Sequence, residues 1–422
     1  MIRAALCLLA AACLSSLPLR AATSREVATQ VADTIEREYF DAARGSAIAD
    51  GLRQAAGRGE FDRHQAPLDL ATALTSRLKA QDRHFNVRWT DPATRGGESG
   101  PPRALPDPAT TGFGIRRVEL LPGNVGYLDL RYFADFDWDD AGAPARKAID
   151  AALQVLGSVD ALLVDVRDNG GGSPAMVGYL SSAFVAPGAD IYNTFRWREG
   201  GASEAPLKTH PSPRLDLPLY ILTSGRTGSA AEAFSYTLKN ARRATVVGER
   251  TGGAANPGRP FGLDDGFSVF VSTGSPVSPV TGKNWEGEGV LPDVAVDASA
   301  ALQAAHALAL ETLVARGAGT PAKWALEALR AEAPDPDAAT LAALSGEYGV
   351  VRIDANGDTL ELRQARRPPL RLRPLGGDLF FVEGDPSRRV RFERDGATAV
   401  AVDMLFADGQ QSRYQRGAAE AH

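Results

Sequence analysis

Apolar and polar positions change their spacing along the chain, and the changes mark out its parts. In residues 24–80, apolar positions recur at helical spacing, as in SREVATQVADTIEREYF, AIADGLRQAAGRG and LDLATALTSRLKA. The segment that follows, HFNVRW, alternates as a strand does. Residues 23–90 are therefore predicted to form an N-terminal helical domain. Residues 91–111, rich in proline, glycine and polar residues, are predicted to be a linker loop.

Between residues 112 and 317, short apolar runs alternate with helical patterns. The predicted strands include NVGYLDLRYF, VDALLVDVRDN, PLYILTS, ATVVGE and FSVFVSTG. Helical patterns such as ARKAIDAALQVLG and SAAEAFSYTLKNA lie between them. Apolar strands separated by helices imply a mainly parallel sheet that is covered on both faces. The segment 112–317 is therefore predicted to be an α/β core.

The C-terminal part has a different pattern. Residues 318–340 contain a short helical segment and a Pro/Asp-rich linker. From 341 to 416, strand-like runs are joined by Gly/Asp turns, which predicts an antiparallel meander that curls into a small barrel. The predicted fold class is thus α/β, with an N-terminal helical bundle, a core with a mainly parallel sheet and a C-terminal antiparallel β-barrel-like domain.

The first 22 residues have the pattern of a cleaved signal peptide. A positive start, MIR, precedes the apolar run AALCLLAAACL and small residues suited to cleavage after Ala21 or Ala22. Acylation at Cys13 is a less favoured reading, because the usual leucine three residues earlier is missing. Both cysteines, Cys7 and Cys13, lie in this segment, so thiol catalysis and Cys-ligated zinc are excluded for the mature chain. We expect a periplasmic or secreted protein.

Composition narrows the possible partners. The chain has 422 residues and a formal net charge of −6, and no Lys/Arg-rich stripe favours nucleic acid. The signal is too short for a membrane span, and no stretch of 18 apolar residues follows it. The run NGGG does not fit GxGxxG, and no GK[ST] follows it. No cofactor and no metal are therefore expected, and the oligomeric state is not predicted.

The candidate catalytic residues lie in two glycine-rich turns, VDVRDNGGG (164–172) and TSGRTGSAAEAF (223–234). Both follow predicted parallel strands, whose carboxyl ends are where ligands gather. Ser229 and Glu232 have the spacing of a helix capping box, which spacing alone favours over a nucleophile. As a nucleophile, Ser229 would stand at a helix N-terminus. There the N–H of Ala230, with that of Gly170 or Gly171, would form an oxyanion hole.

The sequence does not decide which residue would act as the general base for Ser229. Among the histidines, His64 and His84 remain as candidates, and the strand after His84 could fix the orientation of its ring. Lys239 lies about 15 Å along the predicted helix from its start, which is too far. Lys283 in PVTGKNWEGEG is the alternative base. The run SRLK resembles the SxxK of penicillin-binding enzymes but lacks the companion motifs, so an esterase or β-lactamase-like hydrolase ranks last.

Taken together, the motifs resemble the carboxyl-terminal processing (tail-specific) serine peptidases. The matching stretches are LLVDVRDNGGG, LTSGRTGSAAEAF, LKNARRATVVGERTGGAANPG and PVTGKNWEGEGVLPDVAV, in family order. The resemblance covers about residues 24–315 and implies a ClpP/crotonase-like core. It also implies that Ser229 is the nucleophile and that Gly170, Gly171 and Ala230 supply the oxyanion hole.

Within that family, the sequence looks most like the branch of the tricorn core protease and interphotoreceptor retinoid-binding protein. Ala254 stands where the Ser–Lys members carry their lysine. The tricorn-like members use a histidine in a D-x-H segment, which matches His84, and a glutamate in an E-x-x-G-V segment, which matches Glu286. Arg83 stands where tricorn has a further serine, so the residue that orients His84 is not identified.

The resemblance implies an exported serine peptidase. Its substrates would be short peptides or exposed C-terminal tails, since the segment 91–111 is too short for the family's PDZ domain. The retinoid-binding modules share the fold and lack the nucleophile. The alternative is therefore a non-catalytic binding module for an apolar ligand or peptide.

Overall fold

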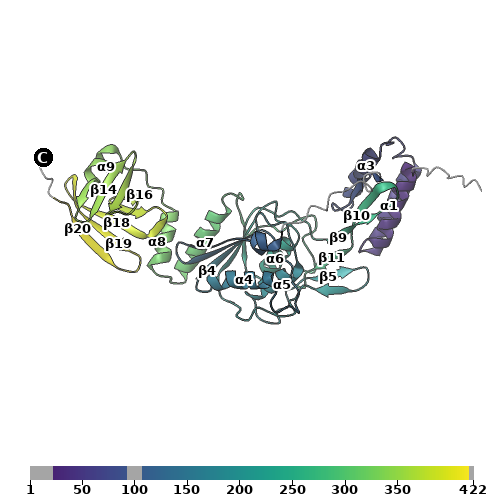
Figure 1. Cartoon of the computed structure of the whole chain (residues 1–422), viewed down its shortest axis with the longest axis horizontal. Helices are drawn as coiled ribbons and strands as arrows, with labels where there is room; N and C mark the ends of the chain where they lie inside the picture. Colours follow the sequence, from purple (N-terminus) through teal and green to yellow (C-terminus); the bar gives the residue numbers. More distant parts are fainter. Residues whose placement is uncertain (1–21, 93–106, 418–422) are drawn as a thin grey trace, which may run out of the picture. The chain divides into compact units, whose positions relative to one another are not determined.

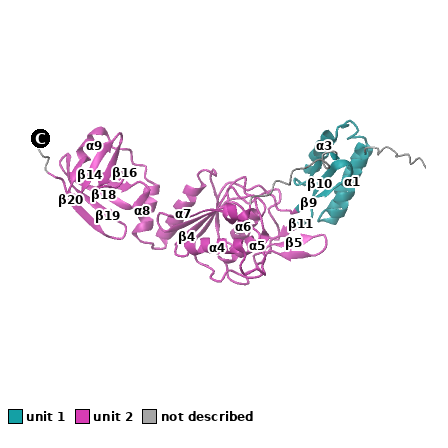
Figure 2. Ribbon diagram, viewed as in Figure 1, with its two compact units in different colours: residues 1–103, 258–274 teal, residues 104–257, 275–422 magenta. Residues whose placement is uncertain are grey.

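The structure, a computed structural model, describes residues 22–92 and 107–417. The predicted signal peptide lies outside these residues except for Ala22, as does most of the predicted linker loop. Within the described residues, no helix has the length and hydropathy of a membrane span. The chain forms two compact units (Figure 2). Unit 1 combines the residues up to 103 with residues 258–274, and unit 2 contains the remainder.

Unit 1 packs helices against a small antiparallel sheet of order β1-β10-β9. Its elements are α1 (Ser24–Glu38), α2 (Ala42–Gly57), α3 (Pro67–Lys79), β1 (Asn86–Trp89), β9 (Gly258–Gly262) and β10 (Phe267–Ser272). Thr23 caps α1 in a capping box with Glu26. Val31 and Ile35 of α1 are fully buried in one cluster with Val269 and Val271 of β10.

The assignment of β9 and β10 differs from the sequence prediction, which placed them in the core. In the structure β10 pairs with β1, more than 170 residues away along the chain, and β9 pairs with the other edge of β10. In β10, Phe267, Val269 and Val271 are buried, whereas Ser268 and Phe270 are only half-buried. Such alternation is typical of a strand with one covered face, not of a strand buried between two helical layers.

Unit 2 is built on a six-stranded sheet of order β12-β8-β7-β4-β3-β2. All neighbouring pairs are parallel except the β2–β3 edge pair, so the prediction of a mainly parallel sheet is confirmed. The strands are β2 (Ile115–Leu121), β3 (Val125–Leu130), β4 (Ala161–Asp165), β7 (Leu219–Thr223), β8 (Thr245–Gly248) and β12 (Val294–Ala295). A separate three-stranded sheet, order β11-β5-β6, contains β5 (Thr194–Trp197), β6 (Gly201–Ser203) and β11 (Gly274–Val277).

Helices cover both faces of the six-stranded sheet (Figure 1). The helices are α4 (Pro144–Val155), α5 (Pro174–Ser182), α6 (Ala230–Asn240), α7 (Ala301–Ala315) and α8 (Thr320–Leu329). Leu162 and Val164 of β4 pack in the cluster that holds α4, α5 and α6. The alternate residue, Leu163, packs in the cluster that holds α7 and α8. Because both faces are buried, β4 is buried along its whole length, and its first four residues are all apolar rather than alternating.

The C-terminal part of unit 2 is an antiparallel sheet in which each strand pairs with the next along the chain. After α9 (Ala338–Leu344) come β13 (Gly346–Tyr348), β14 (Val351–Asn356), β15 (Thr359–Gln364), β16 (Leu370–Gly376), β17 (Leu379–Val382), β18 (Asp385–Asp395), β19 (Thr398–Phe406) and β20 (Gln411–Gln415). A bridge between Tyr348 and Arg416 joins the two ends of the sheet, which makes a nearly closed barrel. The predicted fold class is confirmed.

Candidate active site

The two glycine-rich turns lie against each other. Each follows one of two adjacent parallel strands, β4 and β7, so both emerge at the same edge of the sheet. The N–H of Gly228 donates to the carbonyl of Asn169 at 3.0 Å. A Cβ placed on Gly171 would lie 2.7 Å from the Cβ of Ser229. Only a residue without a side chain fits between the turns, and this packing holds the serine beside the glycines.

Ser229 has an unusual backbone conformation, with φ 51° and ψ −120°. Positive φ is uncommon in a residue other than glycine, and such strain concentrates at functional sites. An ordinary N-cap has extended φ and ψ. Ser173, which caps α5, has φ −81° and ψ 128°, and its hydroxyl accepts from Ala175 N–H. Ser229 therefore differs from a plain cap, and a strained serine between a strand and a helix is typical of a nucleophile elbow.

The capping-box partner Glu232 is completely buried. Its Oε2 accepts from the Ser229 N–H at 2.9 Å. The N–H of Glu232 donates to the Ser229 carbonyl at 2.9 Å, and the N–H of Ala233 does so at 3.0 Å. In the first turn of α6, the N–H groups of Glu232 and Ala233 thus bond to the Ser229 carbonyl, and the Ser229 N–H bonds to the glutamate.

The candidate oxyanion donors differ in availability. In residues 107–417, the N–H groups of Ala230 and Gly170 have no hydrogen-bond acceptor. The N–H of Gly171 instead donates to Asn169 Oδ1 at 2.9 Å, and the amide of Asn169 donates to the Leu130 carbonyl at 2.9 Å. Ala230 N–H points out at the positive end of α6, where an anion is stabilised. The geometry favours Gly170 over Gly171 as its companion, because the Gly171 N–H is already engaged.

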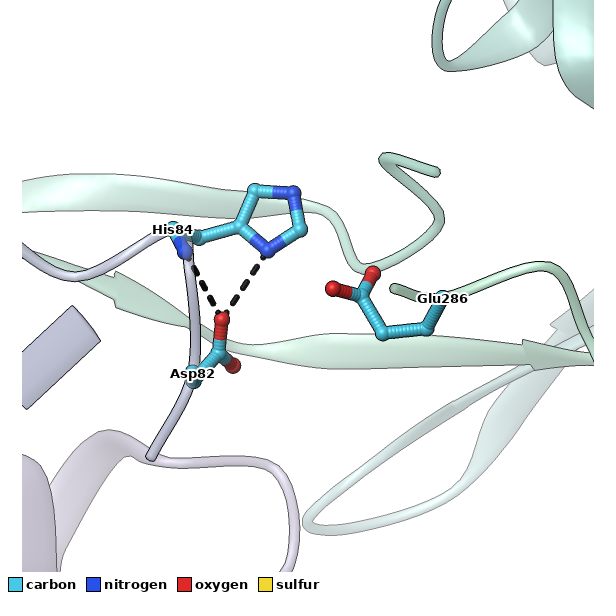
Figure 3. A group of neighbouring side chains, drawn as sticks. All are labelled: Asp82, His84 and Glu286. Atoms are coloured by element: carbon cyan, nitrogen blue, oxygen red, sulfur yellow. Dashed lines mark hydrogen bonds and ion pairs between the residues drawn. The ribbon is translucent and has the colours of Figure 1, made fainter. Parts of the chain in front are cut away.

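His84 belongs to unit 1, where Asp82 fixes its orientation (Figure 3). Asp82 Oδ1 accepts from the His84 backbone N–H at 2.8 Å and lies 3.0 Å from the ring Nδ1. Asp82 Oδ2 accepts from the hydroxyls of Tyr39 and Ser272, at 3.0 and 2.9 Å. Burial alone would raise the pKa of the Asp82 carboxyl, but the hydrogen bonds from His84 and Ser272 outweigh it and lower the pKa to about 2. An ionised Asp82 holds a proton on Nδ1 and leaves Nε2 as the basic nitrogen.

Glu286, also drawn in Figure 3, lies in unit 2 on the loop before β12. Its Oε2 accepts from two successive backbone groups, Ala255 N–H at 2.9 Å and Asn256 N–H at 3.0 Å. Its own N–H donates to Asn284 Oδ1 at 2.9 Å. Trp285, 1% exposed, anchors the loop in the core. One carboxylate oxygen of Glu286 therefore holds the loop after β8.

Known peptidases are similar in sequence to the part of the chain that contains both glycine-rich turns. The sequence profile of peptidase family S41 matches residues 124–296, which include both glycine-rich turns and Glu286. The chain carries a peptidase family S41 domain. Carboxyl-terminal-processing peptidase 1 of Arabidopsis thaliana is 29% identical over 181 residues, which is 42% of this chain and 35% of that protein. The carboxyl-terminal-processing protease of Synechocystis is 29% identical over 179 residues, 42% of this chain and 39% of that protein.

The chain thus spans well under half the length of the curated relatives it matches. Among solved structures, a putative peptidase from Parabacteroides merdae superposes with a TM-score of 0.48 and 19% identity, over 66% of this chain and 90% of that one. The tricorn protease superposes with a TM-score of 0.43 and 13% identity, over 72% of this chain and 36% of that one. The tricorn-like branch remains a prediction.

Asp82 is the functional candidate that sequence reasoning missed. The signal was present, because Asp82 is the first residue of the DRH segment that marked His84, yet no role was assigned to it. The S41 domain includes the alternative base, Lys283, which is exposed on the loop before Trp285. Within either unit, the described residues include no group of three or more histidine, cysteine or carboxylate side chains close enough to share a metal ion.

Proposed function

We propose that this protein is an exported serine peptidase in which Ser229 is the nucleophile and His84 the general base. The S41 domain and the named processing proteases support peptide-bond hydrolysis. The observation that carries the proposal is the strained backbone of Ser229 beside the unengaged N–H groups of Ala230 and Gly170. A serine that only capped α6 would need neither feature.

In the proposed reaction, Ser229 Oγ bonds to the substrate carbonyl carbon as its proton passes to His84 Nε2. The carbonyl oxygen becomes an oxyanion and accepts from the N–H groups of Ala230 and Gly170. The C–N bond then breaks, and the amine leaves with the proton from His84. A water molecule, deprotonated by His84, hydrolyses the acyl-enzyme and restores Ser229.

His84 and Ser229 belong to different units, so their pairing is the part of the proposal that most needs a test. Asp82 supports His84 as the base, because a ring held at Nδ1 by Asp82 can accept a proton at Nε2 without reorientation. Glu286, which has one carboxylate oxygen engaged by backbone amides, is proposed to assist the hydrogen-bonded chain around His84.

The first experiment is labelling with a fluorophosphonate probe together with hydrolysis of a peptide library. Ser229→Ala is expected to abolish both. His84→Ala is expected to lower kcat about 10³-fold or more, whereas Lys283→Met should retain wild-type kcat. The reverse result for His84 and Lys283 would make Lys283 the base. Peptidase activity that persists in Ser229→Ala would refute the nucleophile, and an absence of labelling in the wild type would favour the non-catalytic binding module.

The substrates and the location are proposed from the resemblance of the motifs. We propose short peptides or exposed C-terminal tails as substrates, and a periplasmic or secreted location after removal of the first 21 or 22 residues. N-terminal sequencing of the exported protein tests the cleavage. A mature chain that retains Met1 would refute it.

A further inference from the structure

The buried carboxylate of Glu232 does more than close a capping box. Its Oε2 accepts from Ser229 N–H at 2.9 Å and from Ala254 N–H at 2.8 Å. Its Oε1 accepts from Gly253 N–H and from the Thr251 hydroxyl, both at 2.6 Å. A carboxylate has about four acceptor positions, and all of them are used. Three of the four donors lie on the loop after β8, and a helix cap requires none of these three bonds.

The same loop is held from its other side by Glu286. Four successive backbone N–H groups are divided between two carboxylates: those of Gly253 and Ala254 donate to Glu232, and those of Ala255 and Asn256 donate to Glu286. The loop therefore forms a continuous hydrogen-bonded link from Ser229 to Glu286.

The link is also fixed to the segment that carries Glu286. Thr251 and Val290 exchange two hydrogen bonds, with Thr251 N–H donating to the Val290 carbonyl at 3.2 Å and Val290 N–H donating to the Thr251 hydroxyl at 2.6 Å. The N–H of Gly287 donates to the Gly253 carbonyl at 3.0 Å. The loop cannot shift without breaking bonds to both carboxylates or to this segment.

We propose that Glu232 is a positioning residue, which holds Ser229 in its strained conformation and fixes the loop that orients Glu286. This inference rests on the proposed function. Glu232 acts through the backbone of Ser229 and through Ala254, and it does not touch the substrate. No other side chain bonds the Ser229 N–H in the described part of the chain, so the serine depends on this carboxylate for its placement.

The test is Glu232→Gln, which keeps the size of the side chain. A glutamine offers one carbonyl oxygen, and its NH₂ group must face two of the former donors. At least one backbone N–H then loses its acceptor, because only the Thr251 hydroxyl can reverse its role and accept from the NH₂ group. We expect kcat to fall about 10²-fold, because misplacement of a reacting group by about 1 Å has an effect of that size. KM should change less than about threefold. Amide hydrogen exchange should accelerate at Ser229, Gly253 and Ala254.

Asp293→Asn is the matched control, because Asp293 also accepts a backbone N–H, that of Val246 at 2.8 Å. It pairs with Lys239 near the far end of α6, away from Ser229. We expect this variant to keep the wild-type kcat and the wild-type exchange at Ser229.

A second pair of variants, at Thr251, tests the proposal if Glu232→Gln does not fold. Thr251→Val removes one donor to Glu232, and we expect a fall in kcat of about tenfold that Thr251→Ser restores. Wild-type kcat and exchange in Glu232→Gln, or in Thr251→Val if the first variant is unfolded, would overturn the positioning role while leaving the proposed function intact. An inactive wild-type protein that the probe does not label would overturn both.

Discussion

Gly171→Ala tests whether the close approach of the two turns is what positions the nucleophile. The new Cβ would lie 2.7 Å from Ser229 Cβ, 3.1 Å from its Oγ and 3.2 Å from the Ala230 nitrogen. These are the two groups that would attack the carbonyl and bind the oxyanion. Gly171 also has φ +126°, a conformation that residues with side chains rarely adopt.

Both effects destabilise the variant. A strained backbone conformation costs about 1–3 kcal/mol, and overpacking in a tight site costs about 1–3 kcal/mol. The free energy of unfolding should therefore fall by about 2–6 kcal/mol. Relief of the clash must move Ser229 or Ala230, so the rate of fluorophosphonate labelling should fall by about 10²-fold or more.

Denaturant unfolding and probe labelling measure the two quantities on one preparation. Gly225→Ala is the control in the neighbouring turn: its φ is ordinary, and the nearest atom to its Cβ, Oε2 of Glu249, is 4.0 Å away. We expect it to stay within about 0.5 kcal/mol of the wild type and to label at the wild-type rate. A Gly171→Ala variant with wild-type stability and labelling would refute the packing argument.

Two further substitutions test buried carboxyl groups. Asp82→Asn should lower kcat at least about tenfold, because His84 loses the partner that orients its ring. The free energy of unfolding should fall by about 2 kcal/mol at neutral pH, because the folded-state pKa of Asp82 is about 2; this stabilisation is present above about pH 4 and is lost as the pH falls to 2. Unchanged kinetics would count against the role of Asp82. Glu204 is buried, with Oε2 accepting from Asn193 at 2.8 Å, and burial raises its pKa to about 7. Its contribution is therefore present at low pH and lost as pH rises from about 4.5 to 7, by about 3 kcal/mol. The free energy of unfolding of the wild type should fall across that pH range, whereas that of Glu204→Gln should not. Parallel pH profiles of the two proteins would contradict the raised pKa of Glu204.

Strands are easiest to predict from the sequence where burial on both faces of the sheet produces a continuous apolar run. Strands β4 and β7 of unit 2 are recognisable because each is mostly apolar, is buried along its whole length and is followed by a turn that contains glycine. Their adjacency follows from parallel pairing, so the meeting of Ser229 with the glycine-rich turn is predictable as well. Local pattern and global fold agree at this edge of the sheet.

The parts that the sequence did not predict depend on long-range pairing. Nothing local in β10 shows that it pairs with β1, because an alternating strand suits any half-covered sheet. The engaged N–H of Gly171 follows from the rotamer of Asn169. Three of the four donors to Glu232 come from a loop about twenty residues further on, and the capping-box pattern does not reveal them. Tertiary contacts decide each of these points.

The non-contiguous construction of unit 1 has a consequence for how the chain matures. The helices of unit 1 and β1 leave the ribosome first, but β10 follows about 180 residues later. At typical translation rates of about 5–20 residues per second, this delay is roughly 10–40 s. During that interval the apolar face formed by Val31 and Ile35 lacks its strand partners, and β1 has an unpaired edge. The nascent N-terminal segment can therefore complete its sheet and bury this apolar face only after the strands encoded between residues 258 and 274 arrive.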